Sequence, residues 1–426
     1  MTPTPLASPP ARRFPTLTAT FFASAFALTA CAGADPEPAA GTAAAERAPG
    51  HSREAKTAAP RLVVTYDGGV QVLDARTGNS EADFPVDGFS RLNPAGDGRH
   101  VLVSTAGGFR VLDTGAWSEA HGSHAHHYTG DPALTDLLFP AGKPGHAISH
   151  AGRTALFDDE SGTVRVFNPD DLSAGMLPET IDYQAPQAHH GFAVELGNGQ
   201  MVLTKGDGDG GTGISLLGTP SASGTRELLA GSDDCPGVHG ESIVQGETVV
   251  AGCENGLLVA KNGGITKISS PHPYGRIGNQ AGSEASSVVL GDYKSDRDAE
   301  LERPTRFSLT DTATNELKLI DIDYSYSFRS LGRGGNGEAL VLGTDGKLHV
   351  YDPASGQESA AIEVTDAWTE PLDWQQARPS LFVQDGIAYV SDPAAKQIHA
   401  VDLAEAAVTA TFDLPAEPNE LTGIPG

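Results

Sequence analysis

The chain has 426 residues, with 55 Asp and Glu side chains against 28 Lys and Arg and a formal net charge of −27. So acidic a chain repels phosphate backbones, which excludes nucleic-acid binding and favours cations as ligands, or solubility outside the cell. Its fourteen histidines and three cysteines are the residues most able to bind a metal or form a disulfide.

Residues 1–30 have the pattern of an export signal. Arg12 and Arg13 precede an apolar run that contains no acidic residue and is too short to span a membrane. The run ends in Leu-Thr-Ala-Cys at residues 28–31, which resembles the lipobox of bacterial lipoproteins. We therefore expect Cys31 to carry a lipid that anchors the protein to the outer face of the cell membrane; an ordinary cleaved signal is the alternative.

Residues 31–60 consist mostly of Ala, Pro, Gly, Glu and Thr without apolar periodicity. This composition predicts a disordered tether. If Cys31 is lipidated, Cys235 and Cys253 remain as an even pair. In an oxidising compartment such a pair predicts a disulfide, with metal ligation as the alternative.

Residues 61–426 alternate short β-strands with Gly, Asp and Asn turns. One phrase, an alternating strand that ends in Asp or Asn, recurs at intervals typical of four-stranded propeller blades. Its copies lie at residues 70–74, 109–113, 164–168, 348–352 and 398–402, with weaker copies at 214–217, 257–259 and 306–309. The sequence therefore predicts an all-β fold, a single β-propeller of eight blades, with seven as the alternative. The first blade lacks a strand, which we expect residues 420–426 to supply, so that the ring closes.

The densest histidine cluster is His121-Gly-Ser-His-Ala-His-His-Tyr128, with four histidines in seven residues. Imidazole is the commonest protein ligand of zinc, so His124 and His126 are candidate metal ligands. A solvent-exposed loop with loose metal affinity is the competing interpretation.

Three further histidines occupy the same position in consecutive predicted blades. His146, His190 and His239 each lie at the start of an innermost strand, where it meets the central channel. We call this the entry face. The two cysteines are predicted to meet at this face and to fix His239, and acidic turns such as Asp158-Asp-Glu160 add negative charge.

The arm with His124 and His126 could complete such a site, but it follows a third strand and so starts at the opposite face. A rival site on that face would combine His124 and His126 with His150. Histidines at blade junctions also serve as packing residues. No Gly-x-Ser-x-Gly elbow, Walker loop or zinc-protease helix occurs, so no catalytic residue is predicted.

Four phrases resemble the AztD zinc metallochaperones of bacteria: Ala-His-His-Gly at 188–191, Cys-Pro-Gly-Val-His-Gly-Glu at 235–241, Gly-Cys at 252–253 and His-Ala-His at 124–126. The resemblance extends from Arg61 to the C-terminus. It implies an extracytoplasmic propeller that binds zinc and delivers it to the solute-binding protein of a zinc ABC transporter. Members can carry a His-rich segment before the propeller, whereas the tether here offers only His51, so we expect no N-terminal capture site.

We therefore expect a monomeric, lipid-anchored zinc carrier that is not an enzyme. Its zinc ligands come from a pool of five residues: His124, His126, His146, His190 and His239. Ligand exchange requires an accessible site, so we expect the metal near the surface beneath a mobile His-bearing loop. The alternatives are a propeller hydrolase or lactonase that uses the same cluster with an open coordination position, and a metal-free cell-surface interaction scaffold.

Overall fold

The computed structural model describes residues 52–207 and 210–426. The predicted signal peptide at 1–30, the predicted lipidation at Cys31 and most of the predicted tether lie outside this part of the chain. In the described residues the only helical element is a short 3-10 helix, η1 (Pro169–Ala174). No described helix is long and apolar enough to cross a membrane.

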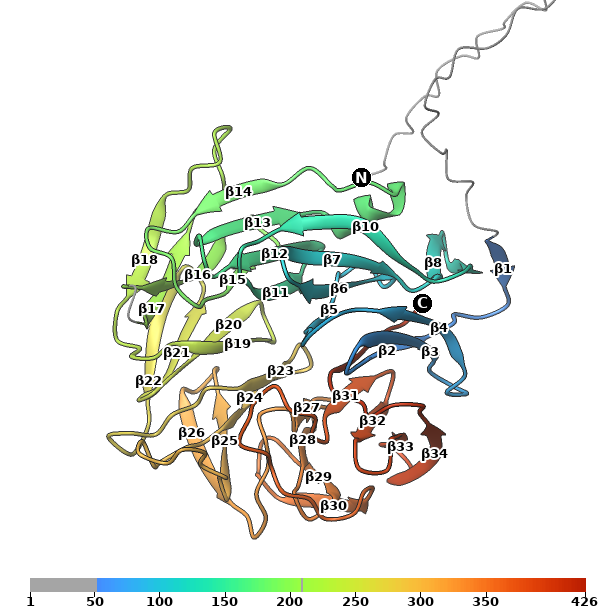
Figure 1. Cartoon of the computed structure of the whole chain (residues 1–426). Coiled ribbons are helices and arrows are strands. Elements are labelled where there is room, and N and C mark those ends of the chain that lie inside the picture. Colours follow the sequence, from blue (N-terminus) through green and yellow to red (C-terminus); the bar gives the residue numbers. More distant parts are fainter. Residues whose placement is uncertain (1–51, 208–209) are drawn as a thin grey trace, which may run out of the picture. The chain divides into compact units, whose positions relative to one another are not determined.

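Eight four-stranded antiparallel sheets follow one another along the described chain, and Figure 1 shows them as successive blades. From the innermost strand outward, blade 1 contains β35 (Leu421–Ile424), β2 (Arg61–Tyr66), β3 (Gly69–Asp74) and β4 (Ser80–Pro85). Blade 2 contains β5 (Leu92–Pro94), β6 (His100–Thr105), β7 (Gly108–Asp113) and β10 (Ala133–Pro140). Blade 3 contains β11 (Pro144–His150), β12 (Arg153–Asp158), β13 (Thr163–Phe167) and β14 (Ile181–Gln184).

The next three blades repeat this order. Blade 4 contains β15 (Ala193–Glu195), β16 (Met201–Gly206), β17 (Gly211–Leu217) and β18 (Leu228–Ser232). Blade 5 contains β19 (His239–Val244), β20 (Thr248–Cys253), β21 (Gly256–Lys261) and β22 (Gly264–Ser269). Blade 6 contains β23 (Gln280–Ser283), β24 (Ser286–Asp292), β25 (Arg306–Asp311) and β26 (Glu316–Asp321).

Two blades complete the series. Blade 7 contains β27 (Leu331–Arg333), β28 (Ala339–Leu342), β29 (Lys347–Tyr351) and β30 (Glu358–Glu363). Blade 8 contains β31 (Leu381–Gln384), β32 (Ile387–Asp392), β33 (Gln397–Asp402) and β34 (Ala407–Asp413). The prediction of an all-β propeller with eight blades is confirmed.

The recurring strand phrase is the third strand of every blade. Its terminal Asp explains why the phrase repeats, because the carboxylate accepts hydrogen bonds from backbone N–H groups of the following turn. Asp74 accepts hydrogen bonds from the backbone of Arg76 and Thr77. Asp402 accepts them from the backbone of Ala404 and Glu405. This local turn fixes where the outer strand starts.

The C-terminal segment closes the first blade. Strand β35 pairs antiparallel with β2, with Arg61 opposite Ile424, so the predicted borrowing of a C-terminal strand is confirmed. Ile424 is buried in a cluster shared by blades 1 and 2, together with Val63 and Val101. The apolar faces of neighbouring blades thus form the core, and closure leaves β2 without an exposed inner edge.

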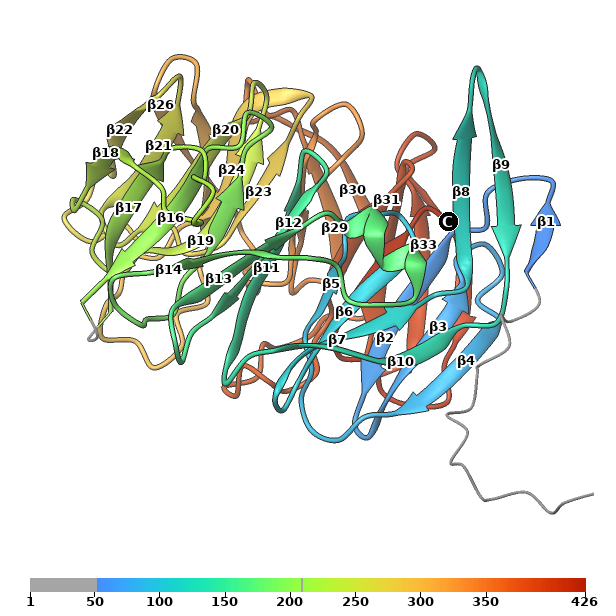
Figure 2. The same ribbon diagram turned by 90° about the horizontal axis from the view of Figure 1, so that it is seen from above.

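A ninth sheet, with only three strands, lies outside the ring of blades. Strands β8 (Ala116–His121) and β9 (His124–Thr129) form a hairpin between the third and fourth strands of blade 2, and β1 (Arg53–Ala55) pairs with β9. Figure 2 shows the hairpin projecting from the blades. The predicted tether is therefore wrong for residues 53–55, because their backbone groups pair with the otherwise open edge of β9.

Candidate metal centre

Three imidazoles converge on the entry face from three consecutive blades. His146 lies in β11, His190 lies just before β15, and His239 is the first residue of β19. Their ring centroids are 5.2 Å (His146 to His190), 5.2 Å (His190 to His239) and 6.0 Å (His146 to His239) apart. One ligand atom from each lies within 4.8 Å of the others. We call these three residues the central triad; small side-chain movements would bring their nitrogens to the roughly 2.0–2.1 Å that zinc requires.

Each imidazole of the central triad is held at Nδ1 by an acceptor. The partner of His146 Nδ1 is Glu241 Oε2 at 2.9 Å, and that of His190 Nδ1 is Asp159 Oδ2 at 2.7 Å. His239 Nδ1 lies 2.8 Å from the carbonyl oxygen of Gly278. Carboxylates and carbonyls accept, so Nδ1 is the donor in each ring, and in the neutral form of each ring Nε2 keeps its lone pair for a metal.

Gly240 allows one of these contacts. Its φ is +70°, and a Cβ there would lie 2.4 Å from the Gly278 carbonyl oxygen. Any other residue would push this carbonyl away from His239. The glycine in the His-Gly-Glu phrase therefore serves the orientation of the histidine before it.

The three environments shift the imidazole pKa values in opposite directions. Burial lowers the pKa of His239 to about 4, and the positive charge of its two histidine neighbours adds to this effect. Burial also acts to lower the pKa of His146, but the charge and hydrogen bond of Glu241 outweigh it and raise that pKa. For Glu241, burial acts to raise the pKa, but the charge and hydrogen bond of His146 outweigh it and lower that pKa. His239 is thus neutral near pH 7, whereas His146 keeps its proton to a higher pH than an ordinary histidine, so protons compete more strongly with a metal for this ring.

The central triad opens onto a cavity of about 600 Å³. His190 is the one exposed member of the central triad, with a side chain that is 46% exposed against 23% for His146, and His239 is partly buried. The wall also contains Phe328 and the half-exposed Trp374. A metal held here would be reachable from solvent at a fourth coordination position.

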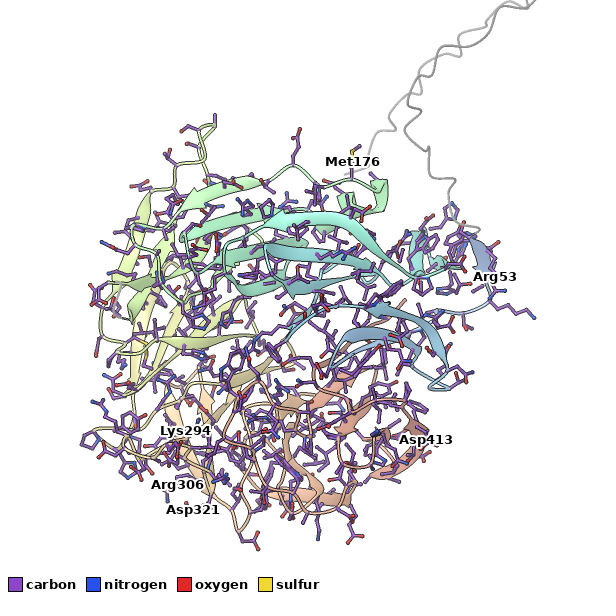
Figure 3. The ribbon with its side chains drawn as sticks, in the orientation of Figure 1. Arg53, Met176, Lys294, Arg306, Asp321 and Asp413 are labelled. Atoms are coloured by element: carbon purple, nitrogen blue, oxygen red, sulfur yellow. A yellow bond between two sulfur atoms is a disulfide. The ribbon has the colours of Figure 1, made fainter. Side chains whose placement is uncertain are left out.

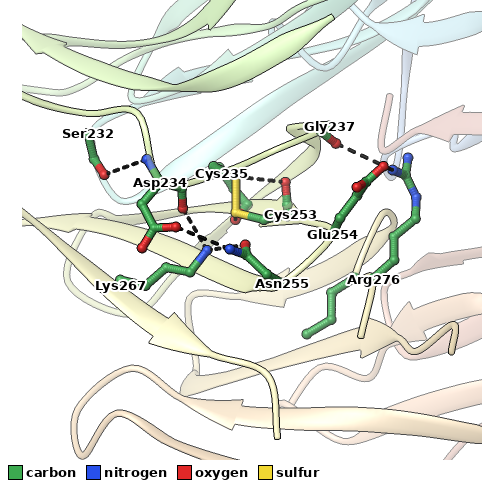
Figure 4. Close-up of a disulfide and its surroundings, with 12 residues drawn as sticks. Ser232, Asp234, Cys235, Gly237, Cys253, Glu254, Asn255, Lys267 and Arg276 are labelled. Carbon is green, nitrogen blue, oxygen red and sulfur yellow. Dashed lines mark hydrogen bonds and ion pairs between the residues drawn. A yellow bond between two sulfur atoms is a disulfide. The ribbon is translucent and has the colours of Figure 1, made fainter. Parts of the chain in front are cut away.

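A disulfide between Cys235 and Cys253 supports the segment that carries His239, as Figure 4 shows. Both cysteines are fully buried, and the bond joins the end of β20 to the chain just before β19. The predicted disulfide is confirmed. A disulfide is typical of compartments outside the reducing cytoplasm, which agrees with export.

A second group of three histidines lies on the β8–β9 hairpin. His121 pairs with His124 across the two-residue turn, and His124 Nε2 is 3.2 Å from His126 Nε2. His121, His124 and His126 place one ligand atom each within 4.8 Å of the others; we call them the hairpin triad. Glu54, in β1, contacts His126 Nδ1 at 2.9 Å.

The two triads are separate groups at opposite faces of the blades. The hairpin follows the end of a third strand, and Ser118 Oγ in β8 donates to the carbonyl oxygen of Gly426, which lies beyond the end of innermost strand β35. The central triad lies where innermost strands begin. His124 and His126 therefore do not join His146, His190 and His239. Of the two arrangements left open, the one in which the arm completes the central site is wrong, because strand direction carries the arm to the opposite face.

The rival set with His150 does not form either. His150 Nε2 contacts Glu247 Oε1 of the β19–β20 turn at 3.1 Å, and His121 takes the third place beside His124 and His126. The turn sequence His-Gly-Ser-His signals this arrangement, because a two-residue turn places its flanking residues directly opposite one another.

Sequence patterns do not identify the groups that hold the rings, because each is distant in sequence from the ring it contacts. Asp159 is recognisable only as negative charge on the entry face, and nothing in the sequence points to Gly278 or Glu54. His189, beside His190, is buried with its nitrogens against the Gln187 carbonyl and Thr204 Oγ1. It belongs to the fold.

Comparison with known proteins supports this description. No family model matches the chain. The zinc chaperone AztD of Citrobacter koseri is 26% identical over 372 residues, 84% of each chain. The crystal structure of Citrobacter koseri AztD superposes with a TM-score of 0.71 at 24% identity, covering 87% of this chain and 98% of that one.

A more distant likeness is limited to the fold. Sqt1 of Saccharomyces cerevisiae superposes with a TM-score of 0.51 at 14% identity, over 84% of this chain and 97% of that one. The chain is therefore a homologue of the zinc chaperone AztD, which confirms the resemblance carried by its histidine and cysteine phrases.

Proposed function

We propose that this protein is an extracytoplasmic zinc carrier that delivers Zn²⁺ to the solute-binding protein of a zinc ABC transporter. The central triad holds the ion, and a lipid on Cys31 anchors the monomeric carrier to the outer face of the cell membrane. Its homology to a protein named as a zinc chaperone supports this assignment. The disulfide agrees with an oxidising location.

One observation carries the proposal: all three imidazoles are anchored through Nδ1. Outer hydrogen bonds of this kind orient metal-binding histidines and raise their basicity. Structural histidines have no need to place one ring nitrogen each within 4.8 Å of the others. Neutral nitrogen ligands with adjacent carboxylates suit Zn²⁺ better than Mg²⁺ or Ca²⁺, which prefer oxygen.

The same site has features that suit release. It offers three protein ligands rather than four, and the cavity leaves the fourth position open to an incoming group. A ligand from an acceptor could bind there before the protein's imidazoles leave. Transfer by ligand exchange would then be faster than spontaneous dissociation.

We further propose the hairpin triad as a second zinc site. Its three imidazoles meet at the end of a projecting hairpin, and Glu54 orients one of them. Two of its members are exposed and lie on an unsupported turn, so we expect weaker binding than at the central triad. An exposed site of this kind suits capture of the ion from solution.

The test is metal stoichiometry and transfer. Wild-type protein should hold two zinc ions, the variant His190→Ala/His239→Ala should keep only the weaker one, and His124→Ala/His126→Ala should keep only the tighter one. His272→Ala, which alters a histidine bound to Tyr293 Oη, is the matched control and should keep both. Unchanged zinc affinity in the first variant would refute the central site.

The transfer step has its own readout. Zinc-loaded protein is mixed with the purified solute-binding protein or with a chelator of equal affinity, and the rate of zinc loss is recorded. Direct handover predicts a rate that rises with acceptor concentration above the dissociation rate. A rate equal to spontaneous dissociation would reject the carrier function while leaving zinc binding intact.

A metal-dependent hydrolase is the second candidate. Three histidines with an open fourth position form the ligand set of several catalytic zinc sites. Ester or lactone hydrolysis by the zinc-loaded protein that disappears in His190→Ala/His239→Ala would support this candidate. Hydrolysis that survives in this variant would count against it.

A further inference from the structure

The cavity over the central triad has the opposite charge character to the rest of the chain. Acidic residues outnumber basic ones by 55 to 28 overall. The cavity wall instead contains four basic side chains, Arg91, Lys143, Arg276 and Lys294, against two acidic ones, Asp159 and Glu241. Both acidic groups are already engaged, since they hold His190 and His146.

Two of the four basic groups form no ion pair, although the charge of one of them, Lys294, acts on the buried Glu370. Lys143 lies 3.8 Å from Asp159 and Arg276 lies 3.9 Å from Glu254, and Figure 4 shows the latter pair. Within residues 52–207 and 210–426, no carboxylate lies within ion-pair distance of Arg91 or Lys294. In a chain with twice as many acids as bases, two unpaired cations in one cavity indicate a ligand of negative charge.

These cations lie close enough to influence the central triad. The positive charge of Arg91 acts on His146 and that of Arg276 acts on His239. The Arg91 guanidinium also lies 5.2 Å from the ring centre of Trp374, which fixes it on the cavity wall. Bound Zn²⁺ would add two positive charges to a wall that is already cationic.

We infer that this cavity binds a small organic dicarboxylate, one carboxylate of which occupies the fourth zinc position while the other pairs with Arg91 and Lys294. The inference rests on the proposed zinc site. A volume of about 600 Å³ is typical of small-molecule sites. Carboxylate oxygen is an ordinary zinc ligand, and guanidinium binds carboxylate through paired hydrogen bonds.

The consequence is that zinc would be held as a ternary complex. A bound acid would complete four-coordination and protect the ion from water, and its departure would open the position that an acceptor needs. Zinc retention should therefore depend on small carboxylates in the surroundings. A site with four protein ligands would not show this dependence.

The experiment uses Co²⁺ in place of Zn²⁺, because its visible spectrum reports coordination number and ligand type. Full-length mature protein is first titrated with Co²⁺, and then with succinate, at constant ionic strength set with sodium chloride. Succinate should change the spectrum at saturation, and dimethyl succinate, which has no charge, should not. The hairpin variant His124→Ala/His126→Ala is used so that only the central triad contributes.

Variants then separate the cationic wall from the metal ligands. Arg91→Gln/Lys294→Gln should bind Co²⁺ and Zn²⁺ at least as tightly as the parent when no carboxylate is present, because two positive charges near the ion are removed. The variant should bind succinate about tenfold more weakly or worse. Arg306→Gln removes an equal charge that pairs with Asp321 outside the cavity and should change nothing. Figure 3 labels Lys294 and Arg306.

Each result has a distinct meaning. If Co²⁺ and Zn²⁺ bind to the central triad but succinate leaves the spectrum unchanged, the dicarboxylate site is refuted and the zinc carrier stands. If succinate acts equally on parent and Arg91→Gln/Lys294→Gln, the assigned cations are wrong and the inference fails. If neither metal binds centrally, the proposed function fails and the ternary complex fails with it.

Discussion

Replacing Glu241 by Gln should weaken zinc binding without removing a zinc ligand. Glu241 Oε2 lies 2.9 Å from His146 Nδ1 in a pair whose side chains are only 17% and 23% exposed. Groups in this outer position typically contribute about 10–100-fold to metal affinity. Gln retains a carbonyl acceptor but loses the charge, so we expect a loss near tenfold, or about 1.4 kcal/mol.

The loss should depend on pH in a defined direction. Glu241 raises the pKa of His146 against the effect of burial, so in the wild type protons compete with zinc for this ring. Gln removes that competition. The difference between wild type and Glu241→Gln should therefore be largest at pH 8 and smaller near pH 6, although the variant binds more weakly at both.

Competition with a chelator of known affinity measures this effect, and a matched control exists in the same blade. Glu247 contacts His150 in a similar Glu–His pair on the opposite face, so Glu247→Gln should leave zinc affinity unchanged. Wild-type affinity in Glu241→Gln at pH 8 would refute the argument. A loss as large as that of His146→Ala would refute it too, since Glu241 would then act as a ligand.

Three other predictions follow from the same structure. Burial acts to lower the pKa of His146, but its carboxylate neighbour raises that pKa above the ordinary 6.5. When zinc affinity is measured at decreasing pH, the affinity should therefore start to decrease before pH 6.5 is reached. An affinity that decreases only below pH 6.5 would contradict this assignment. Cys235→Ala/Cys253→Ala removes a disulfide between residues 18 positions apart and should lower the free energy of unfolding by about 3 kcal/mol, as measured by denaturant-induced unfolding. Equal stability of the oxidised and reduced wild-type protein would count against this prediction. Ile424→Ala truncates a side chain that is 1% exposed and should lower the free energy of unfolding by about 3 kcal/mol, which a lower melting temperature would show. A decrease below about 1 kcal/mol would mean that β35 does not hold the ring closed.

The sequence predicted the features that repeat at short range. In six of the eight blades an Asp or Asn at the end of the third strand accepts a hydrogen bond from the following turn, and the strand pattern alone marks the other two, so eight copies could be counted without a structure. The same counting put His146, His190 and His239 at equivalent positions. Equivalent positions in consecutive blades are neighbours around the channel, which is why the three meet.

Contacts between residues that are distant in sequence could not be predicted in this way. The carbonyl of Gly278 holds His239 from the next blade, and any backbone carbonyl could have done so. Strand β1 lies in a segment whose composition is that of a linker, and only the open edge of β9 makes it a strand. Connectivity already indicated that the hairpin starts at the opposite face, but the predicted ligand set did not include His121 as the partner of His124 and His126 there.

The closure of blade 1 has a consequence for the order of folding. Arg61 at the start of β2 pairs with Ile424, so blade 1 can be completed only after residues 421–424 of the chain have become available. Blades 3, 4 and 5 have no such delay, because each pairs strands that are adjacent in sequence. The three histidines of the central triad can thus assemble on a partly folded chain, and an ion bound at that stage would stabilise the intermediate before the ring is sealed.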